Sequence, residues 1–89
     1  MNYYGVKRET YKNNGKMPYE TIIMPNLFND EEKAFKWAMH DSDSTGLRYG
    51  YKWAGETTQV ETRRNSKTGK DTIYRHEWHV IKFNMEEGE

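Results

Sequence analysis

Two histidines and a glutamate near the C-terminus form the segment His76-Glu77-Trp78-His79. On a helix, the pattern His-Glu-x-x-His places both imidazoles on one face, where they can bind zinc. Here the spacing is one residue shorter, and the segment has the composition of a strand. Alternation along a strand sends His76 and His79 to opposite faces of a sheet. We therefore predict ordinary sheet residues at this segment and no metal site.

A polar stretch in the middle of the chain resembles the first half of an EF-hand calcium loop. Asp41, Asp43 and Thr45 supply oxygens at the first, third and fifth places, and Gly46 occupies the sixth. The bidentate glutamate that closes such a loop would fall at Lys52, whose charge opposes a bound cation. The three oxygen-bearing residues remain a calcium candidate. The alternative is a helix end followed by a glycine turn.

Groups suited to catalysis are sparse. The chain has no cysteine, which excludes disulfides, thiolate zinc sites and cysteine nucleophiles. Its three histidines and scattered carboxylates show no Ser-His-Asp order and no defined carboxylate pair. The glycines are dispersed and form no phosphate-binding loop. We predict a protein that is not an enzyme and that carries no cofactor.

A basic hairpin, residues 61–75, is the basis of an alternative function in nucleic-acid binding. Its candidate contact residues are Arg63, Arg64, Lys67, Lys70 and Arg75. A two-stranded ribbon fits a major groove, and basic side chains at its tip contact phosphates. Residues 48–53 also interleave cations with aromatic rings, as single-strand-binding sheets do. The formal net charge of zero argues against this alternative.

The composition indicates a small domain with a thin core. The chain has 89 residues, enough for one domain, and only two Leu, four Ile and three Val. Seven Tyr and three Trp supply apolar area instead, and their polar groups favour amphipathic surfaces. No run of 18 apolar residues exists, and the N-terminus lacks the features of a signal peptide. We expect a complete, soluble, cytoplasmic protein with no membrane contact, in the host cytoplasm if it is phage-encoded.

Hydrophobic periodicity and turn residues define the expected elements. The predicted strands are 3–11, 19–24, 47–53, 57–64 and 72–83, and the predicted helix spans 30–40. Asn29 is the expected N-cap, with Glu32 three residues later as in a capping box. The order ββ-α-βββ predicts an α+β fold, a five-stranded antiparallel sheet with one helix packed on one face. Residues 1–84 form this single domain, and 85–89 form an acidic flexible tail.

One helix is too small to cover such a sheet. A helix of about 12 residues is roughly 18 Å long, and five strands make a sheet roughly 24 Å wide. Aromatic area should therefore stay exposed. The core residues that we predict are Val6, Ile23, Phe35, Trp37 or Ala38, Leu47, Tyr49, Tyr51 and Trp53.

The absence of catalytic patterns and the excess of aromatic surface together favour a protein-binding or inhibitor function. The expected contact residues are exposed and of types enriched at binding hot spots: Tyr3, Tyr11, Arg63, Arg64, Tyr74 and Trp78. In size and composition the chain is similar in general outline to short accessory proteins of phages and mobile elements. Such proteins, anti-defence proteins among them, bind a host protein, which implies a host or cellular protein as partner. A small-ligand-binding or catalytic protein is a second alternative.

Self-association is a further expectation. The core is short of aliphatic area for a lone domain, and exposed aromatic patches often mark interfaces. Residues 29–46 carry a net charge of −3 and residues 61–82 a net charge of +3. An antiparallel pairing of two copies would set these segments against each other. We therefore predict a two-fold homodimer.

Overall fold

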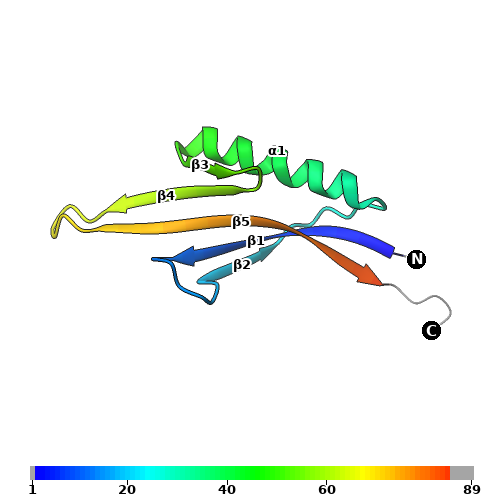
Figure 1. The fold of residues 1–89 in the computed structure, drawn as a ribbon, viewed down its shortest axis with the longest axis horizontal. Coiled ribbons are helices and arrows are strands. Elements are labelled where there is room, and N and C mark those ends of the chain that lie inside the picture. Colours follow the sequence, from blue (N-terminus) through cyan, green and yellow to red (C-terminus); the bar gives the residue numbers. More distant parts are fainter. Residues whose placement is uncertain (1, 85–89) are drawn as a thin grey trace.

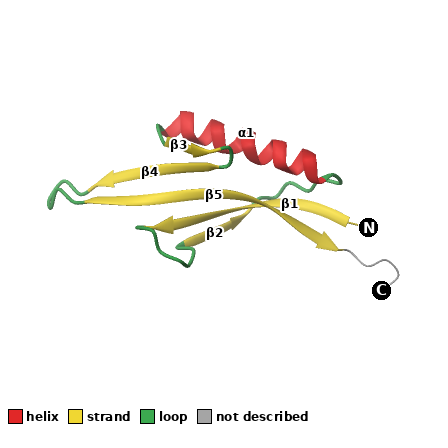
Figure 2. Ribbon diagram, in the orientation of Figure 1, coloured by secondary structure: helices red, strands yellow, loops and turns green. Residues whose placement is uncertain are grey.

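The computed structural model describes residues 2–84, which form one antiparallel sheet and one helix (Figures 1 and 2). The elements are β1 (Asn2–Lys12), β2 (Glu20–Ile23), α1 (Glu31–Tyr49), β3 (Lys52–Gly55), β4 (Thr58–Arg64) and β5 (Asp71–Asn84). Five strands and one helix in the order ββ-α-βββ confirm the predicted α+β fold. The tail predicted for 85–89 lies outside the described residues. In the part of the chain described, no helix is both long and apolar enough to cross a membrane.

The two longest strands lie next to each other in the middle of the sheet, whose order is β2-β1-β5-β4-β3. The register of β1 against β5 runs from Asn2 opposite Asn84 to Lys12 opposite Tyr74. Even-numbered residues of both strands therefore share one face, which α1 covers in part. Odd-numbered residues share the reverse face. We call these two sides the helix face and the reverse face.

Helix α1 extends well past its predicted end. Asp30, rather than Asn29, is the N-cap, and its carboxylate accepts a hydrogen bond from the Glu32 amide at 2.8 Å. The helix ends at Gly50, whose φ of 70° is the left-handed conformation that glycine favours. The predicted helix end near residue 40 and the predicted strand over 47–53 are both wrong.

A stripe of small residues explains why the helix continues. The buried helix residues recur at every fourth position: Ala34, Ala38, Ser42 and Gly46. This spacing places them on one side of the helix and lets it lie close to the sheet. The amide of Gln59 on β4 donates to the Ser42 hydroxyl at 3.3 Å, and a Cβ at Gly46 would overlap that same amide. Close packing of the small residues outweighs the weak helix propensity of the polar stretch.

The core lies under the N-terminal half of α1. Val6, Ala34, Ala38 and Trp78 are buried together, with Trp37 among the partly buried side chains against them. Trp78 is 2% exposed, the largest of the fully buried side chains. Its indole N–H donates to Asp41 on the helix at 2.8 Å, which satisfies the polar group of the core's main aromatic residue.

Most of the aromatic core predicted from residues 47–53 is instead exposed. Leu47, Tyr49 and Trp53 are 87%, 62% and 63% exposed, because they lie at the end of α1 and on the edge strand β3. Ile23 and Phe35 are also exposed, so these five core predictions are wrong. Val6 and Ala38 are buried as predicted, whereas Trp37 and Tyr51 are partly buried.

Candidate functional site

Strand β5 is longer than its neighbour β4 at one end. The β4–β5 pairing stops at Thr58 opposite Glu77, and the Trp78 amide then donates to the Thr57 carbonyl at 2.9 Å. Beyond this point β5 continues to Asn84 and pairs with β1 alone. Figure 1 shows this part of β5 running past the start of β4. Residues 79–84 thus form a free sheet edge on the side away from β1.

Main-chain groups of Val80 and Lys82 face this free edge. In an antiparallel ladder, the hydrogen-bonding direction alternates along each strand. Because the Trp78 amide points toward β4, the N–H and C=O groups of Val80 and Lys82 point the same way. The β1 strand agrees, since the Val6 carbonyl accepts from Met24 on the β2 side. Within residues 2–84, no strand pairs with this stretch of edge.

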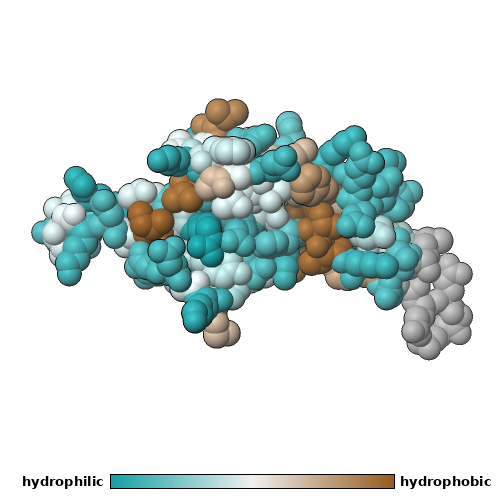
Figure 3. All heavy atoms as spheres, viewed as in Figure 1, coloured by the Kyte–Doolittle hydropathy of each residue, from teal (hydrophilic) through white to brown (hydrophobic). Residues whose placement is uncertain are grey.

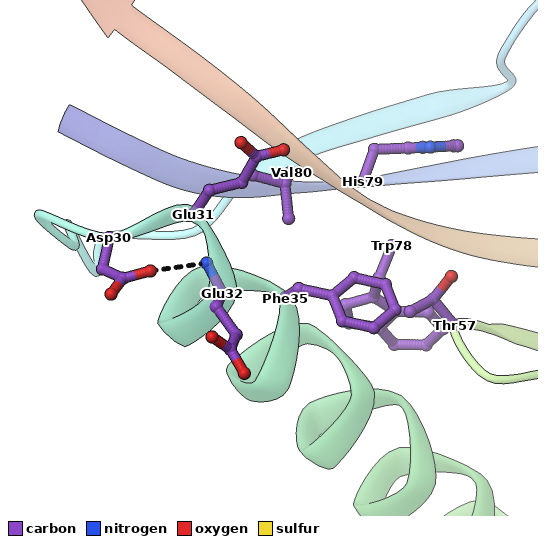
Figure 4. A pocket seen from close by; sticks show the side chains of 8 residues that line it. All are labelled: Asp30, Glu31, Glu32, Phe35, Thr57, Trp78, His79 and Val80. Carbon is purple, nitrogen blue, oxygen red and sulfur yellow. Dashed lines mark hydrogen bonds between the residues drawn. The ribbon is translucent and has the colours of Figure 1, made fainter. Parts of the chain in front are cut away.

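A groove of about 670 Å³ runs between this edge and the first turns of α1. Its lining residues are Asp30, Glu31, Glu32, Phe35, Thr57, Trp78, His79 and Val80. In Figure 4 Glu31 and Glu32 lie on the first turn of α1 after the N-cap Asp30, and only the Glu31 carboxylate points toward Val80. Phe35 reaches from the helix toward Trp78 and Thr57. The groove therefore has an apolar floor and an acidic rim beside main-chain groups that no strand within residues 2–84 pairs with.

A second site, which the sequence did not predict, is a polar cluster at the other end of the helix face. Thr10 Oγ1 and His76 Nδ1 are 2.8 Å apart, and His76 Nε2 lies 2.9 Å from Glu61 Oε1. The ring of Tyr51 stacks on His76 with centroids 5.0 Å apart. Burial raises the pKa of Glu61, but hydrogen bonds from Arg63 and His76 outweigh this effect and hold the pKa below its ordinary value.

The connectivity of this cluster matches that of a catalytic triad, in which a hydroxyl contacts an imidazole and the imidazole contacts a carboxylate. Thr10 and His76 are both buried, however, so the hydroxyl is shielded from a substrate. The cluster arises because β1 and β5 set Thr10 opposite His76, while β4 and β5 set Gln59 opposite His76 and bring Glu61 alongside. The register between the strands brings these residues together, and it cannot be deduced from the order of residues along the chain.

Exposed apolar side chains also gather where α1 meets β3. Leu47, Tyr51 and Trp53 line a hollow of about 280 Å³, and Tyr49 stacks on Tyr51 with centroids 5.6 Å apart. Figure 3 shows that hydrophobic surface on the visible side occurs as separate patches between hydrophilic regions. The aromatic patch is formed by residues from the end of α1, from β3 and from the turn between them.

The predicted partner-binding residues do not form one surface. Tyr3, Tyr11 and Arg64 belong to the reverse face, whereas Arg63, Tyr74 and Trp78 belong to the helix face. Trp78 is a core residue, so the expectation that it is exposed is wrong. Tyr74 is also buried, with the guanidinium of Arg63 lying 4.5 Å from its ring centroid.

The predicted basic hairpin is divided in the same way. Arg63 pairs with Glu61 and Arg64 with Asp71. Arg75 lies on the reverse face, where it pairs with Glu77 and stacks over Tyr11. Lys67 and Lys70 are exposed in the turn. The arginines therefore carry their own counter-charges and point to two faces instead of making one basic stripe.

The calcium-loop interpretation of Asp41, Asp43 and Thr45 is wrong. All three lie within α1, where side chains two positions apart point to different sides of the helix. Asp41 instead accepts the hydrogen bond from Trp78. In the described range, no group of three His, Asp or Glu side chains is arranged to hold a metal ion. His76 and His79 lie on opposite faces, as predicted, and His79 pairs with Glu77 and Glu9.

Comparison of the chain with models of protein families, with curated proteins and with solved structures finds no match. The function of this chain must therefore be inferred from its own structure.

Proposed function

We propose that this protein is a non-enzymatic protein-binding protein, of the inhibitor type, that takes an extended segment of its partner along the free edge of β5. The observation that carries the proposal is the pair of unpartnered main-chain positions, Val80 and Lys82, beside the acidic groove. In strand addition, main-chain hydrogen bonds supply affinity, and pockets for alternate side chains supply specificity.

The chemistry of the groove specifies the partner segment. Side chains of an added strand that point to the helix face would meet Phe35 and the Glu31 carboxylate, because the Glu32 carboxylate is paired with Lys36. An apolar side chain suits the first and a lysine or arginine suits the second. The partner segment is therefore extended, with apolar and basic residues at alternate positions. Its source is a cellular protein in the cytoplasm, a host protein if the chain is phage-encoded.

The same edge supports a two-fold homodimer as a second candidate. In an antiparallel pairing of two copies, Val80 of each copy would exchange hydrogen bonds with Lys82 of the other. Residues directly opposite in such a pair share a face. Each Lys82 would therefore enter beside Glu31 of the other copy. The edge is self-complementary in register and in charge, as a two-fold interface requires.

A proline at position 82 tests the proposal. The Lys82 N–H points to the free edge, so Lys82→Pro removes one donor for an added strand and leaves the β1–β5 ladder intact. Lys82→Ala is the matched control, because it removes the same side chain and keeps the N–H. Peptides selected from a display library on the wild-type protein should show the alternating apolar and basic pattern. We expect them to bind Lys82→Pro at least tenfold more weakly than Lys82→Ala.

Peptides that bind Lys82→Pro as tightly as Lys82→Ala, or that carry no extended pattern, would contradict strand addition. Sedimentation at micromolar concentration separates the two occupants. A single species near 10.7 kDa rules out the homodimer and leaves the edge to a different partner. A dimer that Lys82→Pro dissociates and Lys82→Ala retains would assign the edge to a second copy.

A further inference from the structure

The polar cluster around His76 forms one wall of a hollow that no part of the proposed strand addition uses. This hollow has a volume of about 220 Å³ and lies on the helix face beyond the end of α1. Its lining includes Arg8, Thr10 and His76 from the central strands, with Glu61 and Tyr51. Thr10, His76 and Glu61 are already hydrogen-bonded to one another, so they form a fixed wall rather than free ligands.

Arg8 differs from the other arginines of the sheet. Arg63, Arg64 and Arg75 each donate to a carboxylate. The Nε of Arg8 is buried, and no acceptor in the described part of the chain lies within hydrogen-bonding distance of it. The Arg8 guanidinium lies 5.5 Å from the centroid of the Trp78 ring, which holds it in place without giving the Nε–H an acceptor.

A buried N–H donor without an acceptor is unfavourable for the folded protein. A ligand that supplies the acceptor removes this cost on binding, so the arrangement favours an anionic ligand. The Trp78 ring and the register opposite Arg8 fix the position of the guanidinium before a ligand arrives. Preorganisation of this kind lowers the entropic cost of binding.

We propose that this hollow is a binding site for a carboxylate group, with Arg8 as its main donor. Two arginines line the hollow: Arg63 is held by Glu61, whereas Arg8 has no ion pair within residues 2–84. Glu20 and Glu61 also line it, and their charges repel a dianion such as phosphate more strongly than a monocarboxylate. The planar fork of a guanidinium matches a planar carboxylate in two parallel hydrogen bonds.

The size of the hollow limits what can enter. Sites for whole drug-sized ligands are about 300–1,000 Å³, so this one accepts the end of a small organic acid. Tyr19, Tyr51 and Tyr74 line it as well and provide aromatic walls next to the guanidinium. The expected ligand class is therefore a monocarboxylate whose apolar part lies against tyrosine rings.

Titration of the ¹⁵N-labelled protein with sodium acetate tests the site directly. At constant ionic strength, with chloride as the balancing anion, the Arg8 Nε–H signal should shift in a saturable way. Inorganic phosphate should bind at least several-fold more weakly than acetate. Arg8→Lys keeps the charge but loses the fork, and it should weaken acetate binding about tenfold, which corresponds to about 1.4 kcal/mol. Arg64→Lys is the matched control and should leave the affinity unchanged.

Three results would overturn the assignment: no saturable shift at Arg8, phosphate binding as tight as acetate, or equal affinity in Arg8→Lys and the wild type. The first two use the wild-type protein and do not depend on a variant that folds. Arg8→Met adds a separate test, since loss of an unsatisfied donor should leave the melting temperature unchanged or raised. Lys82→Pro should bind acetate normally, so this proposal and strand addition at β5 can fail independently.

Discussion

The two halves of the helix face use the same pair of strands and hold opposite kinds of side chain. Under the N-terminal half of α1, Val6 and Trp78 pack in a dry core against Ala34 and Ala38. Further along β1 and β5, the same face carries the hydrogen-bonded Thr10 and His76. Figure 2 shows that α1 lies over one end of the sheet and leaves the β4–β5 turn uncovered.

The two halves differ because α1 covers one of them and not the other. The pairing of β1 with β5 is the same in both. Apolar side chains gain stability where a helix removes them from water. Where no helix lies above the strands, polar side chains can remain because they satisfy one another's hydrogen bonds. The covered half therefore holds the fold together, and the uncovered half is available for a ligand. Substitutions in the two halves should have separable effects on stability and on binding.

The largest effect should come from the covered half. Trp78→Ala removes the largest core side chain and leaves the Asp41 carboxylate without its indole donor. We expect a loss of about 3–5 kcal/mol in the free energy of unfolding, measured by urea denaturation. Tyr51→Ala removes an aromatic ring from the uncovered half and should cost clearly less. Equal losses in the two variants would break the distinction between the halves.

The close approach of α1 to β4 is the next test. Gly46→Val would overlap the buried Gln59 amide, and overpacking of this kind costs about 1–3 kcal/mol. Leu47→Val, an equally β-branched change at the neighbouring exposed position, is the control and should cost little. Adding Gln59→Ala to Gly46→Val should restore part of the loss, which a double-mutant cycle measures. Strictly additive losses would show that the two residues do not meet.

The pH dependence of stability probes the uncovered half. The folded-state pKa of Glu61 lies below its ordinary value of 4.5, because hydrogen bonds from Arg63 and His76 outweigh the opposing effect of burial. Its contribution is therefore present above pH 4.5 and is lost as the pH falls through the lower folded-state pKa. Glu61→Gln should lower stability at pH 7 by about 1 kcal/mol. The difference from wild type should shrink during acid titration, and a constant difference would contradict this coupling.

Local sequence signals predicted four of the five strands, but not the strand after the helix or where the helix ends. Asn13 and Asn14 adopt the positive φ angles that a tight turn needs. The polar residues that follow His40 favoured a loop, and only packing against Gln59 shows that Ser42 and Gly46 belong to a helix. Helix propensity is a weak signal that tertiary contact overrides.

The candidate sites could not be predicted because they depend on the register between distant strands. Thr10 and His76 are 66 positions apart and meet only through the β1–β5 ladder. The free edge at Val80 arises from a difference in length between β4 and β5, which the predicted ranges 57–64 and 72–83 already contain, but the groove beside it depends on where α1 lies. Composition indicated exposed aromatic area correctly, yet it assigned Trp78 to the surface.

The smallest effect is expected at the hairpin beyond both halves, where Arg63 and Arg64 lie exposed with their counter-charges. If the hairpin bound nucleic acid, the affinity would fall steeply with salt, by about one log–log slope unit for each phosphate contact. Arg63→Ala with Arg64→Ala would then flatten that slope by about two units. Because Glu61 and Asp71 already neutralise these arginines, we expect weak binding to a DNA duplex and little change in slope. Lys67→Ala with Lys70→Ala is a second variant, which removes the two exposed lysines in the turn of the same hairpin. A steep salt dependence that the arginine pair alone removes would establish the nucleic-acid function instead, and it would show that exposed ion pairs on this sheet open readily to an outside anion.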